Sequence, residues 1–525
     1  MSVRHPTFDT PSRWSVRAAL ALVLGLAVML RFWAIDWGAP YVYHPDEHLV
    51  LHPALDIVRD GDLNPHWFQY PSLLIYLQAG IVAAAQPFVR APLTTDPVLN
   101  HIGPWDVLRA QWPFALGGRL AVAAFAVAGI WLLYSAGARY GAAPLGMAAA
   151  LFLTASVLHN ESSHYLTTDV PATTLLTGAL LFSIAAAQSL GTQKEPRQLA
   201  AAGLCAGLAA ATKYTAGIVL LVPLFVALSS SLRLSVRRGA LIVGAAAIGF
   251  LVACPFVLFD FPAVWGGILE QRHNYLRGYN PGGNWRWYLE YLYWTGLGRP
   301  GAIACALGLF YALIRSVADR TWAGRRLHLA FVIVPVVYFA VISSYPSRAE
   351  RNLIILLPFL CLMGAAVCWR SAQLWRQQNA ATVVFIIGVL LMGSPGISAS
   401  ISWDRQRTFP DTRALALQWI DSHLPAGSRI AREQYTPQVP DARLHVTYVW
   451  SLAWRDYAWY LDQGTDYLVV SSNVYNRALQ PPYVGGVAGP GFYRFIFDHL
   501  PLMAEFVPGI GTSGPTIRIY QVPHG

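Results

Sequence analysis

Long apolar segments recur along most of this chain, and they constrain its fold more than any other feature. A helix needs about 20 apolar residues to cross the hydrocarbon core of a bilayer, and we find eleven such candidates. Only 12% of the residues are charged, against about 25% in typical soluble proteins. The sequence therefore predicts an α-helical, polytopic membrane protein. The predicted spans are 16–35, 113–136, 145–160, 169–189, 199–212, 214–230, 237–257, 299–316, 327–344, 352–369 and 380–399.

The distribution of basic residues predicts the orientation of these spans. Cytoplasmic loops of membrane proteins are enriched in Lys and Arg. A twelfth apolar stretch, 71–89, decides which loops are cytoplasmic. If it lies at the outer membrane surface as an interfacial or re-entrant segment, ten basic residues and only two acids occupy the cytoplasmic loops. If it crosses, the same loops are external. The ten are Arg139, Lys194, Arg197, Arg233, Arg315, Arg320, Arg325, Arg326, Arg370 and Arg376.

We therefore expect an integral, multi-pass protein with eleven spans and a cytoplasmic N-terminus. The net charge of +10 is spread between apolar runs, so we expect membrane lipid, and no nucleic acid, as its environment. Residues 404–525 carry charges throughout, with a helical pattern at 411–424 and strand-like patterns at 466–471 and 516–522. Alternating helix and strand patterns predict a small α/β domain. The chain thus divides into a membrane domain, 1–403, and an extracytoplasmic domain, 404–525.

The first external loop contains adjacent acids and three histidines. Asp46 and Glu47 follow a proline, and His44, His48 and His52 are spaced four residues apart. A structural interpretation is that the acids begin a surface helix, because carboxylates favour a helix N-terminus. Unpaired polar groups beside apolar spans are nevertheless costly, which favours a functional role. Histidine spacing alone is a weak indication of metal binding without a helical HExxH pattern.

Two further ionisable residues lie at the predicted outer ends of spans. Asp169 precedes Val-Pro at the start of a span, where it has the position of a helix cap. Lys213 lies between two short spans and is one of only two lysines in the chain. A lysine at membrane level often extends its amine to the interface. Its external position departs from the usual sidedness, so an anionic partner is an equally good interpretation.

External arginines form the last group of candidates. The loop 258–298 contains Arg272, His273 and Arg277 among aromatic residues, and Arg348 and Arg351 occur in SYPSRAERN. The aromatic residues fit the membrane interface. Basic residues at the outer headgroup level suit the phosphate of a lipid.

Carboxylates together with external cations suit glycosyl transfer from a polyprenyl phosphate. That reaction needs a base for the acceptor and positive charge for the departing phosphate. A phosphate leaves as a stabilised anion, so no general acid is required.

The order of several short motifs resembles a known class of membrane enzymes. HPDE is followed by NPHWFQYPSLLIYL, GGRL, HYLTTDVP, ATKYTAG and SRAERNLIILLPFL. This order is similar to that of the GT-C glycosyltransferases. The resemblance is to family 39, the polyprenyl-phosphate-mannose protein mannosyltransferase type, and to the related lipid A aminoarabinose transferases. It covers roughly residues 16–400.

The resemblance implies a fold and a set of roles. It implies juxtamembrane helices in the first and fourth external loops. It places the family's Asp-Glu motif on Asp46 and Glu47, with the aspartate as base, and the second acidic position on Asp169. The donor-binding loop corresponds to 258–298, which again contains Arg272 and Arg277.

Two departures from the family pattern leave the sugar and the acceptor open. The aminoarabinose transferases have a Lys-Pro pair where this chain has Tyr70 and Pro71, so we expect Lys213 or an arginine in its place. The sugar-binding repeats of eukaryotic protein mannosyltransferases are absent from this sequence.

We therefore expect an inverting glycosyltransferase that transfers sugar from a polyprenyl monophosphate to a glycan, lipid or protein acceptor on the external face. Asp46, Glu47 and Asp169 are the catalytic candidates. The donor-phosphate candidates are Arg272, Arg277, Lys213, Arg348 and Arg351. No cofactor is certain, and a divalent cation is left open, with Glu47 and His273 as candidate ligands. The alternatives are a lipid-linked sugar flippase and a non-catalytic assembly subunit.

Overall fold

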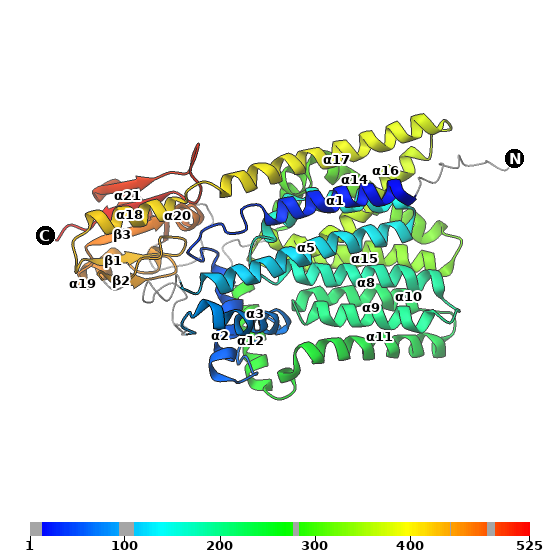
Figure 1. The fold of residues 1–525 in the computed structure, drawn as a ribbon, viewed down its shortest axis with the longest axis horizontal. Coiled ribbons are helices and arrows are strands. Elements are labelled where there is room, and N and C mark those ends of the chain that lie inside the picture. Colours follow the sequence, from blue (N-terminus) through cyan, green and yellow to red (C-terminus); the bar gives the residue numbers. More distant parts are fainter. Residues whose placement is uncertain (1–12, 94–109, 277–282, 441–442, 480–488, 525) are drawn as a thin grey trace.

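The protein consists of a long helical bundle and a smaller mixed domain at one of its ends (Figure 1). A computed structural model describes residues 13–93, 110–276, 283–440, 443–479 and 489–524. The bundle helices run side by side along the longest axis of the molecule. The predicted fold class, a polytopic helical membrane protein with a small C-terminal α/β domain, is confirmed.

Eight helices of the described residues are long and apolar enough to cross a membrane. They include eight of the eleven predicted spans. The other three, 145–160, 199–212 and 214–230, form shorter helical segments, so the count of eleven stays a prediction. The long helices are α1 (Arg13–Phe32), α5 (Trp112–Tyr140), α8 (Asp169–Ser189), α11 (Leu232–Ala253), α14 (Gly298–Ala318), α15 (Trp322–Ser344), η5 with α16 (Glu350–Leu356 and Leu357–Ala372) and α17 (Gln378–Arg407). The shorter segments are α6 (Ala143–Ala155), α7 (Val157–Ser162), α9 (Glu195–Ala210), η2 (Tyr214–Leu220) and α10 (Leu221–Ala227).

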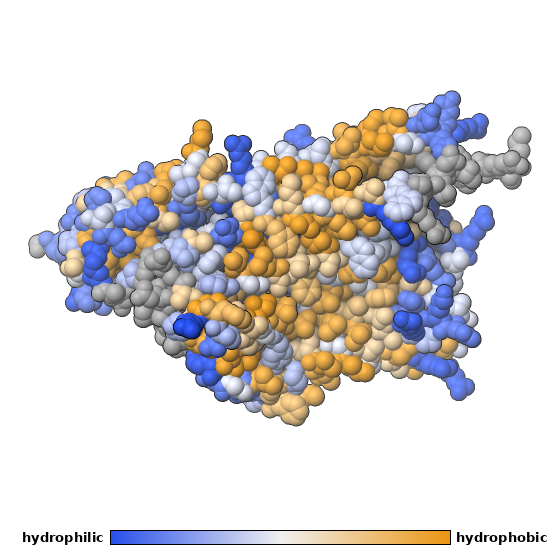
Figure 2. All heavy atoms as spheres, viewed as in Figure 1, coloured by the Kyte–Doolittle hydropathy of each residue, from blue (hydrophilic) through white to orange (hydrophobic). Residues whose placement is uncertain are grey.

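The surface of the bundle is apolar between two more polar ends. Figure 2 shows hydrophobic side chains covering the bundle helices, with hydrophilic side chains at the end farthest from the mixed domain. On α11 and α14, large apolar side chains such as Ile248, Val252, Leu307 and Phe310 are exposed. An apolar belt of this extent is explained by contact with lipid.

Three helices lie across the end of the bundle nearest the mixed domain. They are α2 (His48–Asp60), α3 (Leu73–Val89) and α12 (Phe261–Leu276), and Figure 1 shows them turned across the bundle helices. The segment 71–89 therefore does not run along the bundle as a spanning helix. The first and fourth external loops also contact each other, because Asn64 Nδ2 donates a hydrogen bond to Asp260 Oδ2 at 2.8 Å. The short helix η3 (Pro255–Val257) precedes α12, and α13 (Trp285–Tyr291) and the π-helical turn η4 (Leu292–Gly296) lie between α12 and α14.

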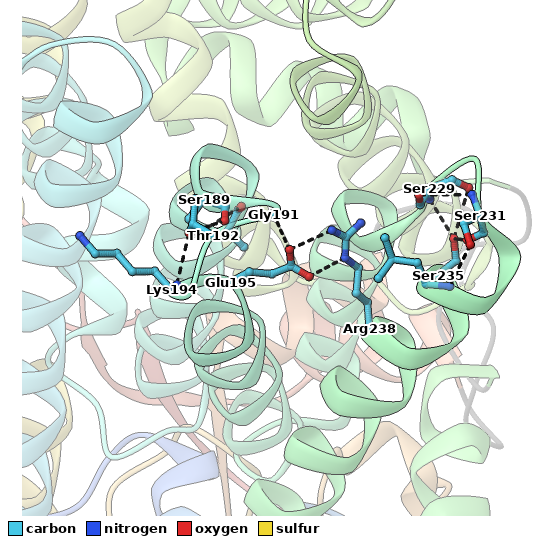
Figure 3. Close-up of polar contacts among 11 residues, drawn as sticks. Ser189, Gly191, Thr192, Lys194, Glu195, Ser229, Ser231, Ser235 and Arg238 are labelled. Atoms are coloured by element: carbon cyan, nitrogen blue, oxygen red, sulfur yellow. Dashed lines mark hydrogen bonds and ion pairs between the residues drawn. The ribbon is translucent and has the colours of Figure 1, made fainter.

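The opposite end of the bundle is stabilised by a charged contact between two helices (Figure 3). Glu195 at the start of α9 accepts two hydrogen bonds from Arg238 of α11, at 2.6 and 2.9 Å. Its Oε2 also accepts from Gly191 N at 2.6 Å. Ser231 caps α11 by accepting from Leu234 N. The acid in this basic loop thus joins α9 to α11.

The C-terminal domain is built on a five-stranded mixed sheet in the order β2-β1-β3-β5-β4. β1 pairs in parallel with β2 and β3, while β5 pairs antiparallel with β3 and β4. The predicted helix at 411–424 and strands at 466–471 and 516–522 are confirmed as α18, β3 and β5. The strands are β1 (Arg429–Arg432), β2 (His445–Tyr448), β3 (Tyr467–Ser471), β4 (Leu502–Phe506) and β5 (Ile517–Gln521). The helices are α18 (Thr412–His423), η6 (Leu452–Trp454), α19 (Tyr457–Asp462), α20 (Ser472–Leu479) and α21 (Gly489–His499). Because α17 continues to Arg407, the boundary at 403/404 stays a prediction.

The first external loop forms part of the hydrophobic core of this domain. Val469 of β3 packs in one cluster with α18 and with Trp37, Tyr41 and Tyr43 of the loop. Its neighbours Leu468 and Val470 pack on the other side of the sheet with α19 to α21. Alternate residues of a strand point to opposite faces, so one face of the sheet contacts the loop. The loop that contains Asp46 is therefore held between the bundle and the domain.

The first prediction concerns topology. Leu63→Cys and Arg320→Cys, each made after replacement of the five native cysteines by alanine, should lie on opposite sides of the membrane. In intact cells, an impermeant maleimide should label position 63 and should label position 320 only after permeabilisation, because the basic loops stay cytoplasmic. The cysteine-free protein is the control. Labelling of both positions from one side would contradict the orientation and the grouping of the external residues.

Candidate active site

A buried ion pair holds the acidic motif of the first external loop. Arg119 of α5 donates from Nε and Nη2 to the two carboxylate oxygens of Glu47, each at 2.7 Å. Both side chains are fully buried. Arg119 also donates to the Trp37 and Ile35 carbonyls, and Glu47 Oε1 accepts from Leu166 N at 2.9 Å. Glu47 is therefore committed to contacts within the fold, which favours a structural role for it.

The glycines before Arg119 allow this close packing. A Cβ at Gly117 would lie 2.7 Å from Ile81 Cγ2 of α3, and one at Gly118 would lie 2.6 Å from Leu166 Cδ1. Real Cβ atoms do not approach other atoms so closely, so a larger residue at either position would require the neighbouring side chains to move. The GGRL motif thus combines close helix contact with a buried guanidinium.

Asp46 lies beside this pair and forms an ion pair with Arg351. It belongs to the short helix η1 (Pro45–Glu47), whose first backbone donors are capped by His44: Asp46 N donates to His44 Nδ1 at 3.3 Å. Asp46 is 18% exposed and Arg351 is 36% exposed. The carboxylate therefore remains accessible, unlike that of Glu47.

The surroundings of Asp46 are strongly cationic. Burial, followed by the charges of Arg351, Arg119, Arg407 and Arg413, holds the pKa of His44 well below its usual value. The His44 ring stacks on Tyr165 at 4.1 Å between centroids. Burial and these guanidinium groups together keep the imidazole neutral. Three of the four have carboxylate partners, since Arg119 pairs with Glu47, Arg351 with Asp46 and Arg413 with Asp411.

A second acid–base pair lies at the outer end of α8. Lys213 Nζ donates to Asp169 Oδ1 at 2.5 Å, and both residues are buried. The charge of Asp169 adds to burial in raising the pKa of Tyr70, and the Tyr275 phenol of α12 is also close to this pair. Asp169 is the first residue of α8, where a carboxylate also benefits from the helix dipole.

The two acid–base pairs are connected through α15 and η5. Tyr338 OH donates to the Asn352 carbonyl at 2.9 Å, next to Arg351. The same phenol acts electrostatically on Lys213. Ser347 N donates to the Tyr275 carbonyl at 3.1 Å. Residues from five segments therefore converge at the end of the bundle nearest the C-terminal domain.

Other candidate residues have different positions. Arg348 lies over the Trp287 ring at 4.8 Å. Arg272 and His273 are exposed on α12, and within the described residues no hydrogen bond joins them to either acidic pair. Arg277 lies outside the described residues. The described part of the chain contains no group of three or more His, Cys, Asp or Glu placed to hold a metal ion.

Several charged residues of the site were not among the sequence candidates. Arg119 belongs to the GGRL motif, but the sequence analysis assigned no role to it. Arg407 and Arg413 follow the last predicted span, and both lie over the Trp37 ring. A signal was available for Arg119, because an arginine within an apolar span is costly unless it is paired. The sequence contains no such signal for Arg413, because the position of Arg413 depends on how the C-terminal domain packs.

The bundle, the juxtamembrane helices and the acids at the outer end together define a GT-C type membrane glycosyltransferase fold. Residues 115–259 match the family model of dolichyl-phosphate-mannose-protein mannosyltransferase. No curated protein matches the sequence. The resemblance to GT-C enzymes that we noted from motif order is thus confirmed.

Solved structures of such enzymes have the same fold. The oligosaccharyltransferase of Archaeoglobus fulgidus, tethered with an acceptor peptide, is 12% identical with a TM-score of 0.58, covering 96% of this chain and 74% of its own. ArnT from Cupriavidus metallidurans, bound to undecaprenyl phosphate, is 15% identical with a TM-score of 0.54. That match covers 95% of this chain and 97% of ArnT.

The second prediction tests the role of Glu47. Glu47→Gln or Arg119→Met alone should destabilise the protein by about 3–5 kcal/mol, because each leaves a buried charge without its partner. The double variant Glu47→Leu/Arg119→Met should recover much of that loss. Denaturant unfolding in detergent, followed by circular dichroism, measures it. A stable but inactive Glu47→Gln would instead assign Glu47 a part in the chemistry.

Proposed function

We propose that this protein is an inverting glycosyltransferase that uses a polyprenyl monophosphate sugar on the external face of the membrane. The observation that carries the proposal is the accessible Asp46 carboxylate, paired with Arg351, among further arginines at the outer end of an apolar bundle. A carboxylate base and cations for a phosphate are the two requirements of this reaction. ArnT from Cupriavidus metallidurans was solved with undecaprenyl phosphate, and the Archaeoglobus fulgidus oligosaccharyltransferase with a dolichol-phosphate. These lipid phosphates support the same donor class.

In the proposed reaction, Asp46 is the base. The acceptor hydroxyl oxygen forms a bond to the anomeric carbon of the donor sugar while its proton passes to the Asp46 carboxylate. The bond between that carbon and the phosphate oxygen breaks, and its electron pair leaves with the polyprenyl phosphate. A single displacement of this kind inverts the configuration at the sugar carbon.

The cations of the site have the complementary task. Arg351 and Arg348 are placed to neutralise the phosphate as it leaves, because guanidinium groups form strong, charge-assisted bonds to phosphate oxygens. Lys213 offers a third positive charge near Tyr70, at the position where the related aminoarabinose transferases have a lysine. Asp169 holds Lys213 in place and begins α8.

A transfer assay distinguishes this function from a flippase or an assembly subunit. Purified protein is incubated with labelled polyprenyl-phosphate sugars and extracted acceptors, and free polyprenyl phosphate is measured. Its release with transfer of label supports the enzyme. Donor binding without turnover for every sugar tested would favour the alternatives.

The third prediction concerns Asp46. Asp46→Asn has the same shape but cannot accept a proton, so turnover at saturating donor should fall by about 10²–10⁴-fold while donor binding remains. If Asp46 only capped a helix, its replacement would cost only about 1 kcal/mol of stability. Asp60→Asn is the control, since Asp60 is an exposed acid of α2 paired with Arg59. Near-normal turnover of Asp46→Asn would make the acidic motif structural.

The fourth prediction separates the two members of the Lys213–Asp169 pair. Lys213→Gln should raise the KM for donor roughly tenfold or more, because about 1.5–3 kcal/mol is expected from a hydrogen bond to a charged group. Asp169→Asn should change it less, because Asp169 acts only through Lys213 and the lysine remains present. Lys194→Gln, the other lysine, lies at the opposite end of the bundle and is the control. Equal changes for Lys213→Gln and Asp169→Asn, with no further change in the double variant, would mean that the pair is only structural.

A further inference from the structure

The contacts of His44 define which of its ring nitrogens carries the proton. His44 caps η1, and Asp46 N donates to its Nδ1 at 3.3 Å. Nδ1 must therefore be unprotonated, because a protonated ring nitrogen cannot accept a hydrogen bond. Burial, and after it the charge of Arg351, holds the pKa of His44 well below its usual value, so the ring is neutral near neutral pH. A neutral imidazole carries one proton, and in His44 that proton lies on Nε2.

The Nε2–H group is available to a ligand. Within the described residues, no hydrogen bond reaches Nε2 of His44. This nitrogen is also not one of the enclosed polar atoms that lack a partner, and His44 is only partly buried. Solvent therefore reaches the Nε2–H group, and a ligand that displaces this water can accept a hydrogen bond there.

The imidazole is held in a fixed orientation. It stacks on the ring of Tyr165, with 4.1 Å between centroids and 26° between the planes. Tyr165 OH donates to Glu161 Oε1 and accepts from Arg407 Nη2, each at 3.3 Å. The Tyr165 ring also meets Trp37 edge-on, at 5.6 Å. One nitrogen of His44 is thus bonded and one face of its ring is covered. A donor fixed in this way loses little further side-chain entropy when a ligand binds.

The neighbours of this donor determine which ligand suits it. Asp46, two residues along the chain, carries the carboxylate that we assign as the base. A hydroxyl group donates and accepts hydrogen bonds, so a hydroxylated acceptor can donate to this carboxylate while one of its oxygens accepts from Nε2. A phosphate offers only acceptors, and the carboxylate repels it. Arg351 provides a phosphate with a charged donor, which forms a stronger bond than a neutral imidazole does.

We propose that His44 is an acceptor-binding residue whose Nε2–H group donates a hydrogen bond to a hydroxyl oxygen of the sugar acceptor. The inference rests on the proposed transferase function and deepens it by assigning the recognition of the acceptor hydroxyl to a residue outside the acidic pair. Asp46 receives the proton of the reacting hydroxyl, and His44 orients the molecule that carries it. Tyr165 is a positioning residue, because it acts on the acceptor only through His44.

The first experiment determines where the proton of His44 lies. Full-length protein labelled with nitrogen-15 histidine is placed in lipid nanodiscs and measured by nitrogen-15 NMR near neutral pH. The His44 signals are assigned by their absence from His44→Asn or His44→Gln. We expect a protonated Nε2 and an unprotonated Nδ1. A proton on Nδ1 would overturn the proposal, because Nε2 could not then donate.

The second experiment separates acceptor binding from donor binding. Asn is a good helix cap, so His44→Asn keeps an acceptor for Asp46 N but is too short to supply the Nε2 donor. Its kcat/KM for the extracted acceptors should fall roughly two- to tenfold, the amount expected for one neutral hydrogen bond. The KM for polyprenyl-phosphate sugar should not change. His44→Gln, whose amide nitrogen can reach the place of Nε2, should recover part of the loss. His423→Asn is the matched control, because His423 is an exposed histidine that also stacks on an aromatic ring, that of Trp419.

Three results of this second experiment would overturn the proposal. They are an unchanged kcat/KM for acceptors in His44→Asn, a higher KM for donor without an effect on acceptors, and a loss that His44→Gln does not relieve. The second of these would assign Nε2 to the donor phosphate, and the third would make His44 a structural cap only. If His44→Asn does not fold, His44→Gln is compared with His44→Ala, which lacks both cap and donor, and equal activity of the two overturns the proposal.

Failure of the proposed function gives a different result. If the wild-type protein transfers no sugar, the transferase function is contradicted, and the acceptor role of His44 is contradicted with it. The NMR measurement does not depend on turnover, so it still decides whether Nε2 is the protonated nitrogen. Transfer by the wild type with an unchanged His44→Asn would instead contradict only the role of His44.

Discussion

The buried ion pair between Glu47 and Arg119 determines where the rest of the site lies. A guanidinium in an apolar bundle is tolerated only when its charge and its donors are satisfied. Here Glu47 and the Trp37 and Ile35 carbonyls satisfy it. These partners lie at the two ends of the segment 35–47. By binding both ends, Arg119 holds this segment against the end of α5. Asp46 is adjacent to Glu47, so its position follows from the same contact.

The fixed loop in turn provides the surface on which the C-terminal domain packs. Trp37 and Tyr43 belong to the core that contains Val469 and Ile519 of the sheet. Arg413 crosses this junction and lies over the rings of both loop residues. The domain therefore contributes a charge near Asp46, and Arg413 adds to burial and to three other arginines in lowering the pKa of His44. The C-terminal domain is thus part of the candidate site as well as an appendage of the bundle.

Sequence reasoning predicted those features that depend on local pattern. The interfacial segment 71–89 followed from charge in distant loops, and β3 and β5 followed from short apolar runs. Asp46, Asp169 and Lys213 were recognised because each is a rare charge at the end of a span. The pairing of these charged residues could not be predicted from the sequence. The Asp46–Arg351 contact joins segments far apart in the chain, and so does the Arg119–Glu47 contact. Arg272 and Arg277 were selected from the sidedness of their loop and from the family resemblance, and their role stays a prediction; Arg272 lies exposed on α12.

The pairing of Asp46 with Arg351 also constrains the order of events in the proposed reaction. While the guanidinium holds the carboxylate, its positive charge stabilises the ionised acid and makes it a weaker base. A donor phosphate entering the site attracts the same guanidinium, and its negative charge grows as the bond to the sugar breaks. If the phosphate takes over Arg351, Asp46 loses its counter-ion and becomes a stronger base near the acceptor hydroxyl. Donor binding would then activate the base, so that the acceptor is deprotonated only when a sugar is in place to receive it.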